Sequence, residues 1–245
     1  MSQVEAEHEG TPSYRQSLFD NDPVFIKTMD RFAAEMNKGG LKELISKNLR
    51  GSPPQKEILL RPLHVSTDKK VQGDFQKLQD GTVIGVDGQD GFVLSVRMTP
   101  EREHALGIVG IIDSRNLPNF PDAVVPEPPS LFPAFPIIAQ VQGPADWWYT
   151  DSSRHIKEKV REVMAQFRWT QVLAESTERW AEEAGFERIG ILAARCLRTD
   201  VPVNFAYLSS RFDGLAVTRK YDSLDFLGVH TRNFPTARQE APVGL

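Results

Sequence analysis

Three adjacent aromatic side chains, Trp147, Trp148 and Tyr149, are the strongest candidates for a binding surface in this sequence. They follow a predicted strand, and Arg154 and His155 stand close behind them as polar groups that could orient a ligand. Large aromatic side chains are costly to leave in water, so they either fill the edge of a core or contact a partner or ligand. We rank this segment first among the binding candidates, with core filling as the alternative.

The other residues that could do chemistry form no recognisable site. The five histidines are scattered without metal-ligand spacing, so no metal site is expected. A cysteine nucleophile would need a nearby histidine, and the sequence does not identify one for Cys196. We therefore interpret Cys196 as a buried structural thiol. The sequence also contains no Ser-His-Asp order, Walker loop or dinucleotide fingerprint.

Composition and charge exclude several classes of protein. The 245 residues contain 29 Lys and Arg against 33 Asp and Glu, a net charge of -4, so no global positive field attracts nucleic acid. No apolar run reaches the roughly 18 residues of a membrane span. The acidic, polar start is unlike a secretory signal. We therefore expect a cytoplasmic protein with neither nucleic acid nor membrane as a partner.

The N-terminal quarter divides into an arm and a helical extension. Residues 1–21 carry few large apolar side chains and are predicted to be a disordered arm. Residues 22–55 form the extension, which begins with an amphipathic helix from Asp22 to Met36. We expect Gly39 and Gly40 to end that helix and a second, short helix to follow at 41–49.

Beyond residue 56 the apolar period becomes that of strands. Strands are predicted at 58–65, 82–86, 92–96, 105–113, 135–141 and 186–194. The turn at 87–91 should join the second and third of these as a hairpin, and 72–79 is predicted to be a short helix or turn. Seven prolines between 117 and 136 indicate an extended connection.

The helical pattern of residues 152–184 contains two apolar stripes that are offset by about half a turn. One straight helix could not bury both, so we predict two helices, or one sharply bent, with the change at 168–170. Gly185 is the predicted stop. The last helix is predicted at 216–227, with Val217 and Tyr221 facing inward, and 229–245 is predicted to be a loose tail.

Two segments resemble the GNAT acyltransferase superfamily. The run ERWAEEAGFERI, residues 178–189, is similar to the family's long third helix passing through a glycine into its fifth strand. The segment from Arg219 to Gly228 is similar to its last helix. The resemblance covers about 81–228. It implies a GNAT-like α/β domain over 56–228, with a mixed, mainly antiparallel sheet flanked by helices.

The resemblance also implies chemistry. An active member would use acetyl-CoA or another acyl-CoA, with a small molecule or a protein as acceptor. Tyr221 would be the general acid that protonates the departing thiolate, and residues 147–155 would line the cleft on the acyl-donor side. Because Tyr221 falls on the inward stripe of its predicted helix, core packing is the alternative role for it.

The sequence departs from the superfamily at the donor site. GNAT enzymes hold the pyrophosphate of acetyl-CoA on main-chain N–H groups before the third helix, where glycine allows close approach. No glycine occurs between Gly143 and Gly185. Two functions remain open. One is an acyl-CoA-dependent N-acyltransferase with an atypical donor site. The other is a non-catalytic GNAT-like binding or structural module that has lost acetyl-CoA binding, in which a second subunit could cover the aromatic loop.

Overall fold

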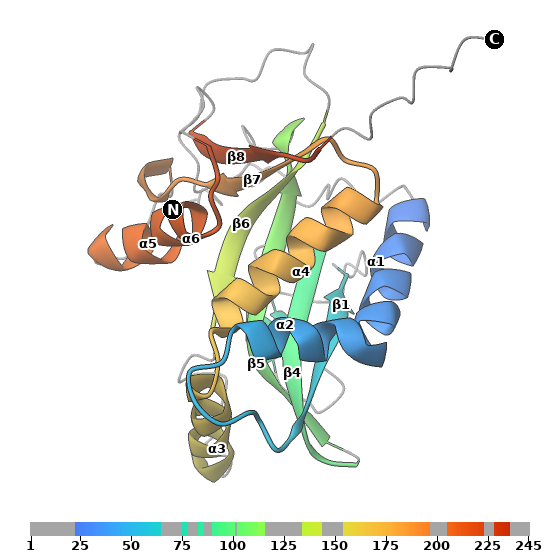
Figure 1. Ribbon diagram of the computed structural model, residues 1–245, viewed down its shortest axis with the longest axis vertical. Coiled ribbons are helices and arrows are strands. Elements are labelled where there is room, and N and C mark those ends of the chain that lie inside the picture. Colours follow the sequence, from blue (N-terminus) through green and yellow to red (C-terminus); the bar gives the residue numbers. More distant parts are fainter. Residues whose placement is uncertain are drawn as a thin grey trace, which may run out of the picture.

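A six-stranded sheet organises the chain in a computed structural model (Figure 1). The structure describes residues 23–64, 75–77, 83–85, 90–100, 102–115, 134–143, 154–196, 205–222 and 228–235. The arm predicted at 1–21, the aromatic segment 147–149, most of the proline-rich connection and the end of the predicted tail lie outside these residues. Within the described part, no helix is long and apolar enough to span a membrane.

The sheet has the order β1-β4-β5-β6-β7-β8 and is mostly antiparallel. Its strands are β1 (Glu57–Leu63), β4 (Asp90–Thr99), β5 (Arg102–Asp113), β6 (Pro136–Gln142), β7 (Arg188–Leu192) and β8 (Val229–Asn233). β6 and β7 pair in parallel, but the pairing is only two residues long: Ile137 pairs with Gly190 and Ile138 with Ile191. Beyond Ile138, β6 therefore continues with β5 as its partner among the described strands. The predicted mixed, mainly antiparallel α/β class is confirmed at this level.

The predicted hairpin between 82–86 and 92–96 is wrong. β3 (Val83–Gly85) pairs with β2 (Phe75–Lys77) in a separate two-stranded sheet, whereas β4 pairs with β1 and β5. Residues 75–77 are thus a strand, where the sequence predicts a short helix or turn. The turn residues at 87–91 indicate that the chain reverses there. They do not indicate which strand each flanking segment pairs with, because that depends on residues far away in the sequence.

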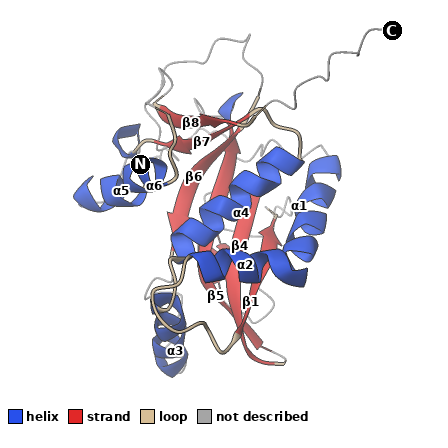
Figure 2. Cartoon of the chain, in the orientation of Figure 1, coloured by secondary structure: helices blue, strands red, loops and turns tan. Residues whose placement is uncertain are grey.

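Three helices, α1, α2 and α4, cover one face of the large sheet (Figures 1 and 2). α1 (Pro23–Glu35) and α2 (Leu41–Lys47) are separate helices, and η1 (Met36–Gly40) lies between them. Gly39 has non-helical φ and ψ angles of 169° and -31°, so the helix is interrupted at the glycines, as the sequence predicts. The predicted apolar stripe of α1 is buried at Met29, Phe32 and Met36.

The predicted break near residue 168 is confirmed. α3 (Arg154–Ala165) and α4 (Trp169–Glu183) are separate helices joined at Gln166–Arg168. α4 ends where predicted, because Gly185 adopts a positive φ of 85° that favours glycine. The N–H groups of Gly185 and Phe186 donate to the carbonyls of Glu182 and Ala181, which is the Schellman pattern.

The predicted last helix is wrong in position. α5 (Phe205–Arg211) and α6 (Asp213–Thr218) precede it, and α6 ends nine residues before the predicted Leu227. Its end is also a Schellman pattern, in which Lys220 takes the left-handed φ of 58° and Tyr221 donates its N–H to the carbonyl of Ala216. Glycine is the usual residue at such an end, so a lysine there gives no signal in the sequence. Val217, predicted to face inward, is 74% exposed.

β8 corrects the predicted tail. Residues 229–233 pair antiparallel with all of β7, and Val229 and Thr231 are buried while His230 and Arg232 are partly exposed. Five residues with only two buried positions give too short an alternation to be recognised from the sequence.

An aromatic row joins the helices to the sheet. Phe92 of β4 contacts Phe32 of α1 and Trp180 of α4 at centroid distances of 5.7 and 5.9 Å, and Trp180 contacts Phe186 at 5.8 Å. Phe92 and Trp180 are at most 1% exposed. These edge and tilted contacts each add about 0.5–1.5 kcal/mol to the area that they bury. They fix α4 across the centre of the sheet.

Asn37 of η1 pairs with the outer strand as another strand would. Its Nδ2 donates to the carbonyl of Leu60 (2.9 Å), and the Leu60 N–H donates to its Oδ1 (2.8 Å). β1 is the edge of the sheet, where main-chain groups otherwise face water or another chain. The amide therefore docks the helical extension and covers part of that edge.

We predict that Asn37→Ala lowers the free energy of unfolding by about 1–3 kcal/mol, because both main-chain groups of the buried Leu60 lose their partner. Urea unfolding followed by circular dichroism measures the change. Lys38→Ala is the control, since its ion pair with Glu35 is exposed and should contribute within about 0.5 kcal/mol. Equal stability of the two variants would contradict the docking role of Asn37.

Lys220→Gly should raise the free energy of unfolding by about 0.5–1 kcal/mol, because glycine adopts the positive φ at the end of α6 without strain. Lys220→Ala keeps that strain and should bring no gain. The same urea titrations distinguish them, and a gain from alanine as large as that from glycine would show that the φ angle is not the cause.

Candidate functional site

The start of α4 is the candidate site because the sequence leads us to expect a GNAT-like acyl donor there. The linker before it is paired with the chain that leaves α2. Arg50 donates its N–H to the carbonyl of Gln166, and Arg168 donates its N–H to the carbonyl of Asn48, both at 2.8 Å. Leu49 and Phe167 face each other across this antiparallel bridge. Phe167 is buried, so the alternating side chains of Arg50 and Arg168 project outward from the same side.

This pairing leaves few main-chain donors for an anion. The Trp169 N–H donates to the carbonyl of Phe167 (3.0 Å), and the N–H groups of Gln171 and Val172 donate to that of Arg168. Arg168 itself is the N-cap, and it makes no side-chain cap hydrogen bond. In the first turn of α4, the N–H group of Thr170 is the one that finds no acceptor among the described residues. A phosphate cradle needs several converging N–H groups.

The side chain of Trp169 fills the adjoining space. A Cβ on Gly107 of β5 would lie 2.5 Å from its ring, and one on Gly143, just after β6, would lie 3.1 Å from it. The ring therefore rests on two bare stretches of main chain. The Arg211 guanidinium lies over the same ring, 5.2 Å from its centroid, in a cation–π contact. The two glycines thus accommodate the indole, because neither has a side chain in its way.

A buried ionic cluster lies at the middle of α4. We define the Glu178 cluster as Glu175, Glu178, Arg219 and Arg232. Arg219 donates to both oxygens of Glu178, from Nε at 3.0 Å and Nη2 at 2.5 Å, and from Nη1 to Glu175 at 2.7 Å. Arg232 donates to Glu178 at 2.8 Å. The cluster joins α4 to the end of α6 and to β8.

The pKa of Arg219 reflects these contacts. Burial alone would lower it, but hydrogen bonds and charges from Glu178 and Glu175 raise it above its ordinary value. The Glu178 side chain is 5% exposed, so losing either partner would leave a buried charge. This arrangement is that of a structural clamp, since every oxygen of the two carboxylates accepts from an arginine.

Tyr221 lies beside this cluster and not on a helix facing a cleft. It packs against the main core, and its hydroxyl oxygen is buried next to Glu178 without a well-aligned hydrogen bond. Burial first, and then the charge of Glu178, raise the pKa of Tyr221 well above its usual value. The phenol stays neutral at physiological pH. Its surroundings match the packing role that the sequence left open.

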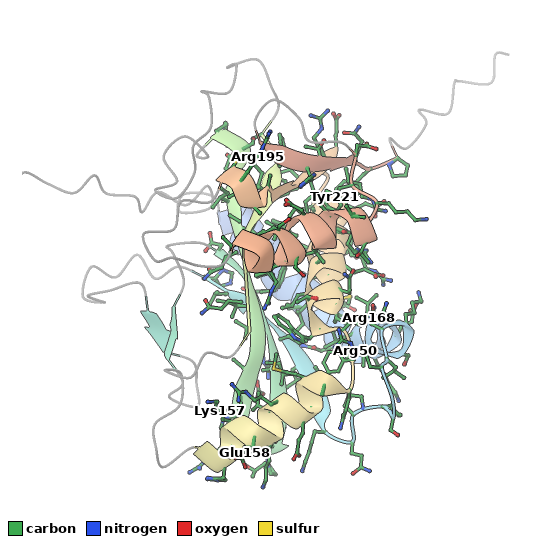
Figure 3. The ribbon with its side chains drawn as sticks, turned by 90° about the vertical axis from the view of Figure 1, so that its left-hand side faces the viewer. Arg50, Lys157, Glu158, Arg168, Arg195 and Tyr221 are labelled. Carbon is green, nitrogen blue, oxygen red and sulfur yellow. The ribbon has the colours of Figure 1, made fainter. Side chains whose placement is uncertain are left out.

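Of the predicted site residues, the structure describes Arg154, His155 and Tyr221, and it does not bring Tyr221 together with the other two. Figure 3 shows Tyr221 and the residues of α3 at opposite ends of the molecule. His155 is exposed on α3, Arg154 begins that helix, and Trp147, Trp148 and Tyr149 lie outside the described residues. Glu178 and Arg232 were missed, because no local pattern links residues 54 positions apart.

A second polar group joins η5 (Ala194–Cys196), α5, α6 and β8. Asp213 accepts from the Ser209 hydroxyl (2.7 Å) and the Ala194 N–H (3.1 Å), and its other contact is His230 Nε2 (3.0 Å). Burial would raise the pKa of Asp213, but these hydrogen bonds lower it. In a nucleophilic triad the histidine lies between the serine and the carboxylate. Here Ser209 and His230 both contact the Asp213 carboxylate directly, so this group is not such a triad. The described residues contain no group of three or more His, Cys, Asp or Glu able to hold a metal ion.

Comparison with protein families, with curated proteins and with solved structures gives no match to this chain.

Replacing Tyr221 by phenylalanine should make the stability of the protein less sensitive to alkali. The pKa of Tyr221 is raised in the folded state, so as the pH passes about 10 the unfolded chain releases a proton that the folded chain keeps, and stability falls. Tyr221→Phe has no such proton. Urea unfolding of both proteins at pH 7.5 and pH 10.5 measures this. The variant should match the wild type at the lower pH and exceed it at the higher one. A gap that does not widen with pH would show that the hydroxyl is not held in this way.

Proposed function

We propose that this chain is a GNAT-like domain that acts as a binding or structural module and does not hold acetyl-CoA at the start of α4. The observation that carries the proposal is the use of the α4 main-chain donors by the chain itself. Arg168 donates to Asn48, and Trp169 donates to Phe167. A diphosphate would have to break these bonds to obtain its own.

The order of the elements supports the GNAT-like part of the proposal. Antiparallel β1, β4, β5 and β6 are followed by helices α3 and α4, parallel strand β7 and helices α5 and α6. Antiparallel strands followed by strand, helix, strand and helix are the order that the resemblance implies, whereas β8 lies beyond the predicted domain. Fold likeness alone is a weak warrant for activity, so the choice between enzyme and module depends on the site.

Two features of the site support a module over an enzyme. Trp169 occupies the space beside Gly107 and Gly143, and Arg211 lies over its ring, which leaves less room there for a donor. The implied general acid, Tyr221, has its hydroxyl buried against Glu178. A general acid must reach the group that it protonates.

The second candidate is the acyl-CoA-dependent N-acyltransferase with an atypical donor site, and the arginine pair beside the α4 start favours it. Arg50 and Arg168 are exposed, they lie close together in Figure 3, and no contact of their side chains is found within the described part of the chain. As diagonal neighbours across the bridge they are about 7–8 Å apart at Cα. Two guanidinium groups at this spacing could hold a diphosphate from outside, without the main-chain cradle.

Thermal unfolding with and without millimolar acetyl-CoA tests the choice. The module predicts an unchanged Tm, whereas a ligand at 100 times its Kd would add about 2.7 kcal/mol. The double variant Arg50→Gln and Arg168→Gln is the matched comparison. If acetyl-CoA raises the Tm of the wild type but not that of the double variant, the chain binds the donor through the arginine pair, and the module proposal is wrong.

A further inference from the structure

A cavity of about 440 Å³ opens at the end of the sheet where β6 and β7 begin and β8 ends. Its walls are Phe135, Phe186, Glu187, Arg188 and Asn233 together with Gly185. This volume is within the range of sites for small ligands. The cavity lies at the opposite end of α4 from Trp169, because Gly185 and Phe186 directly follow that helix. It is therefore separate from the candidate donor site.

Arg188 is held in place on this wall. Its Nε donates to Asn233 Oδ1 at 2.8 Å, and its guanidinium lies 5.7 Å from the centroid of the Phe135 ring. Neither contact uses Nη1 or Nη2, and no other contact of these two nitrogens is found within the described segments. A guanidinium fixed through Nε presents its two terminal nitrogens as a fork, which matches the two oxygens of a carboxylate.

The apolar wall is equally fixed. Phe135 is 4% exposed and packs with Ile137 and Leu192 in the small core on the far face of the sheet. Phe186 is held by its main-chain bond to Ala181 and by its contact with Trp180. Rigid aromatic side chains bind a flat apolar group with little loss of side-chain entropy.

Glu187 restricts the charge of the ligand. Its exposed carboxylate lies next to Arg188 in the cavity wall, so the two charges nearly balance. A phosphate monoester, with a charge of about -1.5 to -2, would be repelled more strongly by Glu187 than a singly charged carboxylate would be.

We propose that this cavity binds a monocarboxylate that carries an aromatic or similarly flat apolar group. The carboxylate pairs with the Nη1 and Nη2 groups of Arg188, and the apolar group lies against Phe135 and Phe186.

Phenylacetate is the probe, titrated to about 20 mM against the full chain and followed by NMR or calorimetry, since a fragment with a Kd near 1 mM saturates in that range. Binding to the wild type should be in the millimolar range. Phenylacetamide has the same shape without the charge and should bind about tenfold more weakly. This comparison needs no variant, so it remains decisive if a substitution impairs folding.

Removing the charge of Arg188 or of its neighbour Glu187 should affect phenylacetate binding differently. Arg188→Gln should weaken phenylacetate binding about tenfold, whereas Glu187→Gln should leave it unchanged or strengthen it up to about threefold. Arg102→Gln is the control, because Arg102 is exposed at the end of β5 remote from Asp113, the residue that pairs with β6 beside the cavity. No binding by the wild type, equal binding of phenylacetamide, or equal loss from Arg188→Gln and Arg102→Gln would overturn the proposal.

Discussion

The bridge between Asn48–Arg50 and Gln166–Arg168 is the interaction on which the functional account depends. Two main-chain hydrogen bonds tie the chain leaving α2 to the joint between α3 and α4, and one of them uses the amide of Arg168 in that joint. A helix start normally offers unpaired N–H groups and a partial positive charge to an anion. Here the protein supplies the acceptors itself. The same bridge also orders Arg50 and Arg168 on the outer surface. It therefore leaves few main-chain N–H groups for an anion, but it leaves the two guanidinium groups available for weaker binding.

The position of α4 follows from contacts at both of its ends. At its start, Trp169 lies on Gly107 and Gly143, which have no side chain to displace it. Near its middle, Glu178 is clamped by Arg219 and Arg232. Nearer its end, Trp180 meets Phe92. Because these contacts come from β4, β5, α6 and β8, α4 is tied to most of the sheet, and a ligand that displaced its first turn would disturb much of the core. The cavity beside Arg188 requires no such displacement, which is why it is the better place for a small ligand.

Local patterns predicted much of the fold and little of the site. The split between α3 and α4 was predictable because two apolar stripes half a turn apart are visible in one short window, and the end of α4 because Gly185 marks it. The end of α6 was missed because Lys220 takes a conformation usually left to glycine, and this error placed Tyr221 on a helix. The burial of Glu178 was missed because its partners lie 41 and 54 residues away. The bulky side chains before α4 were visible in the sequence. The carbonyls of Asn48 and Phe167, which accept from the N–H groups of Arg168 and Trp169, could not be predicted from it.

Amide hydrogen exchange at the α4 start, measured by NMR with and without coenzyme A, tests the central claim most directly. If the bridge holds, the amides of Arg50 and Arg168 exchange slowly in the free protein, and coenzyme A leaves their rates unchanged. Rapid exchange of these two amides in the free protein, with protection appearing only when coenzyme A is added, would show that the donors are available to a phosphate and would contradict the account.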